Sequence, residues 1–212
     1  MTEVSGGRAQ VTRAALLAAA QDVFATAGYA DANVTDIVDQ AGSSVGSLYH
    51  HFGGKSDLYI ALYDDYQLRQ QHRSARAFRT ALAAGEEDAL QLFIVGARAY
   101  LEGCWEERQL ARLFLSGGGP PGFELLTRRR FRSWLRTNAT LLGEQAHPLS
   151  DMLILVLTTI ATEAGREVAV ASSKARARQM IDEVLDLMGR LYPKESTSEA
   201  SAPPPRPRRP TR

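Results

Sequence analysis

Apolar residues recur at intervals of three and four along almost the whole chain, and clusters rich in glycine, proline or serine separate the resulting blocks. In the first block, Leu16, Ala20 and Phe24 follow one another at intervals of four, and Gly28 favours the left-handed conformation that often ends a helix. The pattern predicts an all-α protein of about nine helices. They are expected near residues 11–27, 34–41, 45–51, 56–84, 86–104, 107–115, 123–142, 150–171 and 173–192.

The second and third predicted helices are short, and Gly42-Ser43-Ser44 separates them, as in a helix-turn-helix. Ala41 and Gly42 allow the two helices to approach closely. The apolar seam between them is expected from Val34, Ile37, Val38, Leu48 and Phe52. The outer face of the third helix carries small or hydrogen-bonding side chains, which suit a helix that enters a major groove. These are Ser44, Val45, Gly46, Ser47 and His50.

The spacing of these residues matches a known pattern. Its elements are Gly28-Tyr29, residues 34–37, Ala41-Gly42, Ser44-x-Gly46-x-Leu48-Tyr49-x-His51-Phe52 and Lys55-x-x-Leu58. Over about the first sixty residues, the chain resembles the DNA-binding domain of TetR/AcrR-type transcriptional regulators. The remainder is similar only in being a longer helical domain, which in that family binds ligand and dimerises.

The resemblance implies that residues in and around the third helix contact DNA. Ser44 would cap that helix, Asn33 would cap the second helix, and Gly46 would permit close approach to the DNA. Ser47 and His50 would reach base edges. The predicted DNA-contacting residues are Asn33, Thr35, Ser44, Val45, Gly46, Ser47, Tyr49, His50, His51 and Lys55.

The charge balance sets the expected strength of this contact. The chain carries 25 Lys and Arg against 24 Asp and Glu, so its formal charge is only +1. Residues 1–60 have three basic and six acidic side chains, a formal charge of −3. Phosphate contacts are expected from Tyr49, His51 and Lys55, with Arg8 and Arg13 as possible additions. Because each neutralised phosphate contributes roughly 0.9 to the salt slope, we predict weak non-specific binding and a shallow slope.

Aromatic side chains spread over several helices of the second half predict either an ordinary core or an apolar cavity for a small molecule. The candidate lining residues are Phe93, Tyr100, Trp105, Phe114, Phe131, Trp134, Leu155 and Thr159. The last two helices carry more apolar surface than one core requires. Residues 152–160 are apolar nearly all round, and residues 180–191 form a broad apolar stripe. This excess predicts a homodimer through a two-fold four-helix interface.

Other chemistry has little support in the sequence. The adjacent His50 and His51 point about 100° apart on a helix, so we expect no metal site. Cys104 cannot form an internal disulfide, and a buried, unreactive thiol is favoured over a redox sensor. The run Arg128-Arg129-Arg130-x-Arg132 favours a solvated helix face or a contact to an acidic ligand over nucleic acid. No nucleotide fingerprint or catalytic triad pattern is present, so neither an enzyme nor a cofactor is expected.

These features predict a DNA-binding domain at residues 9–68, a ligand-binding and dimerisation domain at 69–193 and a disordered Pro/Arg-rich tail at 194–212. The predicted function is that of a cytoplasmic transcriptional repressor. It would bind a palindromic double-stranded operator as a dimer and be released by a largely apolar small-molecule effector. The alternative is a helical small-molecule-binding or scaffold protein with weak or lost DNA binding. No apolar run is long enough for a membrane span.

Overall fold

Nine helices and no strand form the regular structure of the residues that the computed structural model describes, namely 3–115, 117–143 and 149–191. The predicted all-α fold is therefore confirmed. The helices are α1 (Glu3–Asp31), α2 (Val34–Gln40), α3 (Val45–Phe52), α4 (Lys55–Ala83), α5 (Ala89–Glu106), α6 (Arg108–Leu115), α7 (Phe123–Gly143), α8 (Asp151–Val170) and α9 (Lys174–Arg190). The expected tail at 194–212 lies outside the described residues.

Local capping chemistry explains where several helices begin. The side chains of Ser44, Asp88, Ser150 and Ser173 each accept hydrogen bonds from backbone N–H groups in the first turn that follows. The first helix differs from expectation at both ends. It begins at Glu3 rather than near residue 11, and its regular path breaks at Gly28, where φ is +75°, before the chain continues to Asp31.

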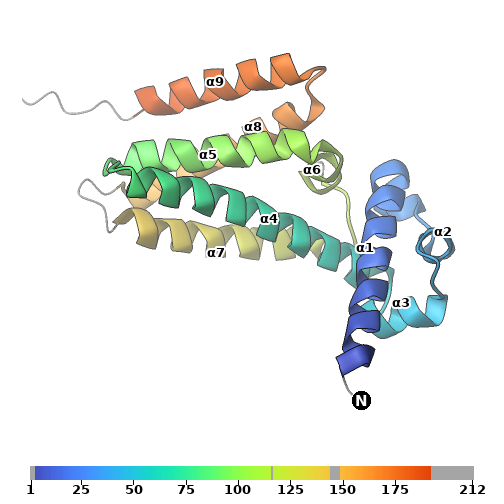
Figure 1. Cartoon of the computed structure of the whole chain (residues 1–212). Helices are drawn as coiled ribbons and strands as arrows, with labels where there is room; N and C mark the ends of the chain where they lie inside the picture. The colour runs from blue at the N-terminus through green and yellow to red at the C-terminus, as the bar shows by residue number, and fades with distance from the viewer. Residues whose placement is uncertain (1–2, 116, 144–148, 192–212) are drawn as a thin grey trace, which may run out of the picture.

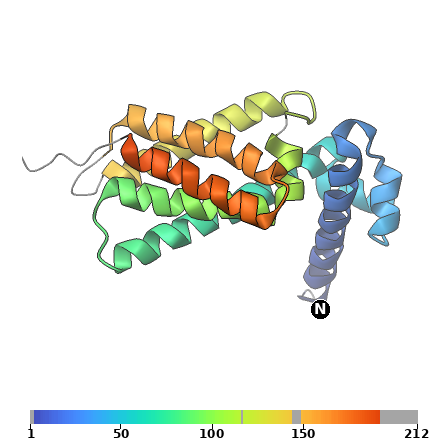
Figure 2. The ribbon, with the colours of Figure 1, turned by 90° about the horizontal axis from the view of Figure 1, so that it is seen from above.

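The helices form two units that share α4 (Figures 1 and 2). Helices α1 to α3 surround the start of α4, and α1 runs across the end of the bundle formed by α4 to α9. Within the bundle, α5 packs against α4, α8 and α9. The expected division between residues 68 and 69 falls inside the continuous helix α4, so a functional division there stays a prediction. None of the described helices has the length and apolar character needed to span a membrane.

An aromatic cluster centred on Tyr59 joins the two units. The Tyr59 ring is fully buried, and its centroid lies 5.2 Å from those of Phe24 and Tyr29 in α1. It also lies 5.3 Å from the ring of Phe114 in α6 and 5.2 Å from that of Phe123 in α7. All four contacts are edge-to-face, the arrangement that aromatic rings favour.

The hydroxyl of Tyr59 adds polar contacts to this packing. It donates to the carbonyl oxygens of Gly118 at 2.9 Å and Leu113 at 3.3 Å. Burial raises the pKa of this phenol, so it stays a donor at neutral pH. One α4 side chain thus connects α1, α6, α7 and the segment before α7.

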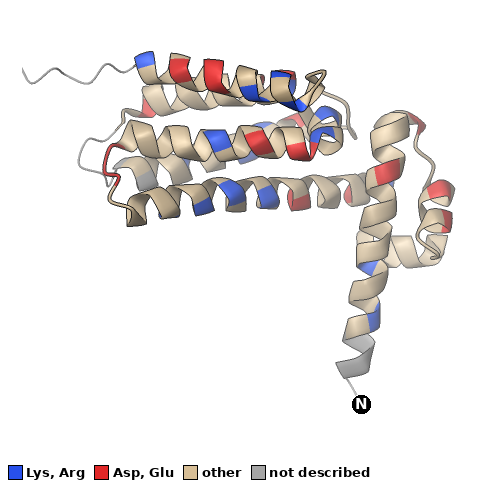
Figure 3. Cartoon of the chain, turned by 45° about the horizontal axis from the view of Figure 1, so that its top comes forward, with Lys and Arg blue, Asp and Glu red and all other residues tan. Residues whose placement is uncertain are grey.

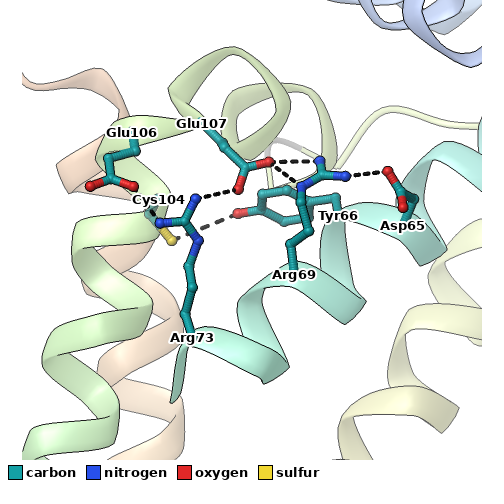
Figure 4. Close-up of polar contacts among 7 residues, drawn as sticks. All are labelled: Asp65, Tyr66, Arg69, Arg73, Cys104, Glu106 and Glu107. Carbon is teal, nitrogen blue, oxygen red and sulfur yellow. Dashed lines mark hydrogen bonds and ion pairs between the residues drawn. The ribbon is translucent and has the colours of Figure 1, made fainter. Parts of the chain in front are cut away.

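A network of charged side chains fixes the α5–α6 corner against α4 (Figure 4). Arg69 Nε donates to Glu107 at 2.7 Å, and Arg73 donates to the other oxygen of the same carboxylate at 3.0 Å. The two guanidinium groups also pair with Asp65 and Glu106, respectively. Because Glu107 is only 17% exposed, this pairing is screened less by salt than a surface ion pair.

Replacement of Tyr59 tests the role of this packing. We expect Tyr59→Ala to lower the free energy of unfolding by about 3–5 kcal/mol, because it removes a buried ring. Tyr59→Phe keeps the ring and loses only the two hydrogen bonds, so we expect a loss of about 1–2 kcal/mol. Urea unfolding followed by circular dichroism measures both values. Equal losses in the two variants would contradict a central packing role for the ring.

Candidate nucleic-acid interface

Helices α2 and α3 pack as a helix-turn-helix around a buried apolar seam. Ile37, Val38 and Leu48 are buried, and Phe52 is only 8% exposed. The turn needs a residue with positive φ at Gly42, where φ is +59°. The Ser43 N–H then donates to the Val38 carbonyl at 2.8 Å. The predicted seam is therefore confirmed at Ile37, Val38, Leu48 and Phe52.

The two ends of α3 are each defined by a local feature. At the start, Ser44 Oγ accepts a hydrogen bond from the Ser47 backbone N–H at 3.2 Å, as the sequence predicted. At the end, Gly53 adopts φ +76°, and its N–H donates to the Tyr49 carbonyl. These contacts hold the eight-residue helix in place without using its outer face.

The outer face of α3 is accessible. Tyr49 is 55% exposed and Val45 is 44% exposed, so neither side chain belongs to the core. Ser47, His51 and Lys55 are half-buried. The exposed members of the predicted set are Asn33, Thr35, Ser44, Val45, Gly46, Tyr49 and His50. The structure thus leaves most of the predicted residues accessible on α3 and at the start of α2.

Lys55 is engaged within the protein. Its Nζ donates to the carbonyl of Ala30 at 3.0 Å and to that of Ala32 at 2.7 Å. It also lies 4.7 Å from the centroid of the Tyr29 ring, and the Tyr29 hydroxyl contacts Ser56 Oγ at 2.7 Å. An ammonium group at the C-terminal end of α1 donates to carbonyl groups that have no partner within the helix. Its positive charge is also attracted to the negative end of the helix dipole. This geometry favours a structural role for Lys55, and its phosphate contact stays a prediction.

Asn33 also differs from expectation. It occupies the position before α2, but its side chain accepts no hydrogen bond from the backbone of that helix. Instead its Nδ2 donates to Asp36 at 3.5 Å. The expected side-chain cap is therefore wrong.

Charged residues of both signs lie on this unit (Figure 3). Arg8 and Arg13 lie on the free end of α1, whereas Asp36 and Asp39 lie on α2. The Arg13 guanidinium carbon is 5.0 Å from the centroid of the Phe52 ring, which places a positive charge beside α3. Asp36 of α2 also lies beside a predicted contact residue, because Asn33 Nδ2 donates to it at 3.5 Å. Charges of both signs therefore lie next to the predicted DNA contacts.

The predicted ligand-lining residues occupy different environments in the bundle. Phe93 and Phe114 are buried, and Phe114 belongs to the Tyr59 cluster. Tyr100, Trp105, Phe131, Trp134 and Leu155 are half-buried. Thr159 is exposed, and its hydroxyl donates to the Leu155 carbonyl of its own helix at 2.8 Å, so it does not face the interior.

Two surface hollows lie away from these side chains. One, of about 300 Å³, lies between α1 and the α5–α6 corner. The other, of about 490 Å³, lies between α5 and α9. Neither is lined by any of the eight predicted residues. Among the described residues, no group of three or more His, Cys, Asp or Glu side chains could hold a metal ion.

The sequence of the helix-turn-helix unit is similar to that of known regulators. Residues 16–62 match the family described as "Bacterial regulatory proteins, tetR family". The repressor AcnR of Corynebacterium glutamicum is 36% identical over 62 residues, which are 29% of this chain and 33% of the relative. The activator FasR of Mycolicibacterium smegmatis is 46% identical over 50 residues, which are 24% of this chain and 23% of the relative. The matches thus span a third or less of these relatives.

Solved structures resemble the chain over most of its length. A TetR-family regulator from Pectobacterium atrosepticum is 27% identical, with a TM-score of 0.55, and the match covers 87% of this chain and 94% of that chain. The regulator FadR from Bacillus subtilis, solved in complex with stearoyl-CoA, is 17% identical, with a TM-score of 0.64. That match covers 82% of this chain and 96% of that chain, and at this identity it shows the fold alone.

The contacts of Lys55 lead to a prediction about stability without DNA. We expect Lys55→Met to lower the free energy of unfolding by roughly 1–3 kcal/mol, because two carbonyls lose a charged donor. Lys174→Met, at an exposed position in the first turn of α9, serves as control and should change it by less than about 0.5 kcal/mol. Chemical denaturation of the free protein gives both values. An unchanged stability of Lys55→Met would show that the ammonium group is not needed to hold α1.

Proposed function

Because this chain belongs to the TetR family of bacterial regulatory proteins and carries its helix-turn-helix domain, we propose that it binds a palindromic DNA operator as a homodimer. We further propose that it represses transcription until a small-molecule effector releases it. The observation that carries the proposal is the amphipathic geometry of α3. Leu48 and Phe52 are buried on one side, while Tyr49 and His50 are exposed on the other.

The exposed face of α3 has the chemistry needed to read a major groove. Gly46 has no side chain to hold the helix away from the bases, and Ser47 and His50 offer short hydrogen-bonding groups. Tyr49 can donate its hydroxyl to a phosphate. With few basic residues nearby, base contacts and neutral hydrogen bonds contribute more to binding here than counterion release.

A dimer would place two copies of α3 on the same DNA. Met152 and Val156 of α8 are 67% and 41% exposed, and Leu187 and Leu191 of α9 are 51% and 44% exposed. Because α8 and α9 run antiparallel in the bundle (Figure 1), the start of α8 and the end of α9 lie at the same end. A second copy could cover this apolar surface through a two-fold axis. Two α3 helices about 34 Å apart would then read a pseudo-palindrome.

Effector release requires that the bundle and α3 be mechanically connected. The Tyr59 cluster and the contact between α1 and α6 supply that connection. An effector bound in the bundle would favour a dimer with a different spacing of the two α3 helices. A hundredfold change in operator affinity needs an effector that distinguishes the two states by about 2.7 kcal/mol. FadR, which has a similar fold, was solved in complex with stearoyl-CoA, and this supports the proposal that a small molecule acts on this chain.

The alternative function is that of a helical small-molecule-binding protein with lost DNA binding. The observation that favours it is the formal charge of −3 on residues 1–60. Gel retardation of the DNA upstream of the protein's own gene, at several salt concentrations, separates the two. Retardation that depends on the sequence of the probe supports the regulator function. No retardation even at low salt supports the alternative function.

Variants of α3 test the proposed DNA contacts. We expect Tyr49→Phe to weaken binding to all DNA sequences roughly fivefold, about 1 kcal/mol, because only a phosphate hydrogen bond is lost. Replacing Ser47 and His50 together by Ala should cost about 1–3 kcal/mol for each base contact and reduce the preference for the operator. Fluorescence anisotropy with operator and scrambled DNA measures both effects. Unchanged operator preference in the double variant would contradict base reading by these two side chains.

The proposed dimer surface can be tested separately from DNA binding. Met152→Glu combined with Leu187→Glu places charges in the apolar patch, so we expect a monomer that has lost operator affinity. Leu125→Glu changes a residue of α7 that is also 55% exposed, and we expect it to leave the dimer intact. Light scattering during size-exclusion chromatography gives the mass of each variant. If the double variant is still a dimer, the dimer interface does not lie at this apolar patch.

A further inference from the structure

The interior of the bundle contains polar side chains where apolar ones would be expected. We define the Gln70 layer as Tyr66 and Gln70 of α4 with Tyr100 and Cys104 of α5. Tyr66, Gln70 and Cys104 are between 0% and 2% exposed. The Tyr66 hydroxyl and Cys104 Sγ are 3.7 Å apart (Figure 4). Gln70 continues the i, i+4 series of Leu62 and Tyr66, so the sequence places it on the buried face of α4.

Both polar atoms of the Gln70 amide are buried without a hydrogen bond of good geometry to the rest of the described chain. The amide lies beside the Tyr66 hydroxyl and partly offsets the effect of burial on the pKa of that phenol. Yet among the described residues neither its Oε1 nor its Nε2 has a contact with hydrogen-bond geometry. The buried hydroxyl of Thr158 in α8 is also unpartnered within the described part of the chain. Because native interiors rarely leave such groups unpaired, both need an explanation such as a bound molecule.

Two glycines create the space in which these polar atoms lie. A Cβ built at Gly103 would lie 2.2 Å from Gln70 Oε1. A Cβ at Gly165 of α8 would lie 3.1 Å from both Cys104 Sγ and the Tyr100 hydroxyl oxygen. The neighbouring helices therefore accommodate the Gln70 layer only because both positions lack a side chain. The polar atoms of α4 and α5 are directed toward these glycines.

The charge around the layer determines which ligands it could accept. Burial raises the pKa of the Tyr66 and Tyr100 phenols and raises that of the Cys104 thiol to about 11. All three therefore remain neutral donors at physiological pH. The nearby guanidinium of Arg73 is already paired with Glu106 and Glu107. A ligand anion would gain no free cation here and would be repelled by the Glu107 carboxylate.

We propose that the Gln70 layer binds the polar group of the effector, and that this group is a neutral one that both donates and accepts hydrogen bonds, such as an alcohol, a phenol or an amide. The inference rests on the proposed effector-release function. Neither surface hollow is lined by residues of the layer. Because Tyr66, Gln70 and Cys104 are buried, a ligand must part the helices around the layer to enter. Because α5 leads directly into α6, which contacts α1, this opening can reach the helix-turn-helix unit.

The first experiment tests whether the Gln70 amide is unpaired in the free protein. Gln70→Met keeps the length of the side chain and removes both polar atoms, so we expect the melting temperature to rise by about 2–4 °C. Gln67→Met is the matched control on the same helix. Gln67 Nε2 donates to the Tyr63 hydroxyl at 2.9 Å, so its replacement should lower the melting temperature. A fall in Gln70→Met would show that the amide already has a partner, such as bound water, and would overturn the proposal.

The second experiment tests the class of ligand. Phenol, benzene and benzoate are titrated into the full-length protein, and the amide signals of Gly103 and Gly165 are followed by NMR. We expect saturable shifts with phenol in the native protein and a loss of the phenol response in Gln70→Met. Shifts as large with benzene, stronger binding of benzoate, or no response to phenol would each contradict a neutral polar site.

Operator binding measured with and without phenol separates this inference from the proposed function. Phenol that binds the layer and also weakens operator binding supports both. Phenol that binds the layer while operator binding is unaffected supports the site and contradicts effector release through it. A protein that never binds the operator but shows the phenol response would retain the site and lose only the regulatory function.

Discussion

The packing of one buried phenol ring holds the exposed helix α3 in a defined position relative to the rest of the molecule. Tyr59 contacts two rings of α1 and one ring each of α6 and α7. Each edge-to-face pair contributes about 0.5–1.5 kcal/mol beyond simple burial. Because α3 packs on α1 and α4, a shift of α6 or α7 against Tyr59 would be transmitted to it. The distance between two α3 helices in a dimer depends on this contact.

Three buried or half-buried polar groups in the structure behave differently. The Lys55 ammonium group has two carbonyl partners, and the Glu107 carboxylate has two guanidinium partners. Both therefore stabilise a junction between helices. The Gln70 amide has no contact of good hydrogen-bond geometry among the described residues, which lowers the stability of the bundle rather than raising it. A destabilising group in an otherwise well-packed core is typical of a site that is completed by a ligand.

The exposed face of α3 is held by a rigid scaffold, and its electrostatic attraction for DNA is modest. The caps at Ser44 and Gly53 and the seam at Leu48 fix α3 without using its exposed side chains. Arg13 lies beside Phe52 of α3, and Asp36 of α2 contacts Asn33, so charges of both signs border this face. Such an arrangement favours recognition through base contacts over indiscriminate attraction to phosphate. Specificity and affinity would then depend on a few short side chains.

The sequence by itself determined the helices, the cap at Ser44 and the buried seam of the helix-turn-helix. Leu48, Phe52 and Ser44 could be assigned because helical periodicity and capping act over three or four residues. Only the tertiary structure decided the roles of Lys55, Tyr59 and Gln70. Lys55 meets a carbonyl 23 residues away, and Tyr59 meets one 59 residues away, so no local pattern signals either contact. Gln70 lies at a position that periodicity marks as buried, but whether its amide finds a partner depends on which helix faces it. That helix presents Gly103, which offers space and no hydrogen bond from a side chain.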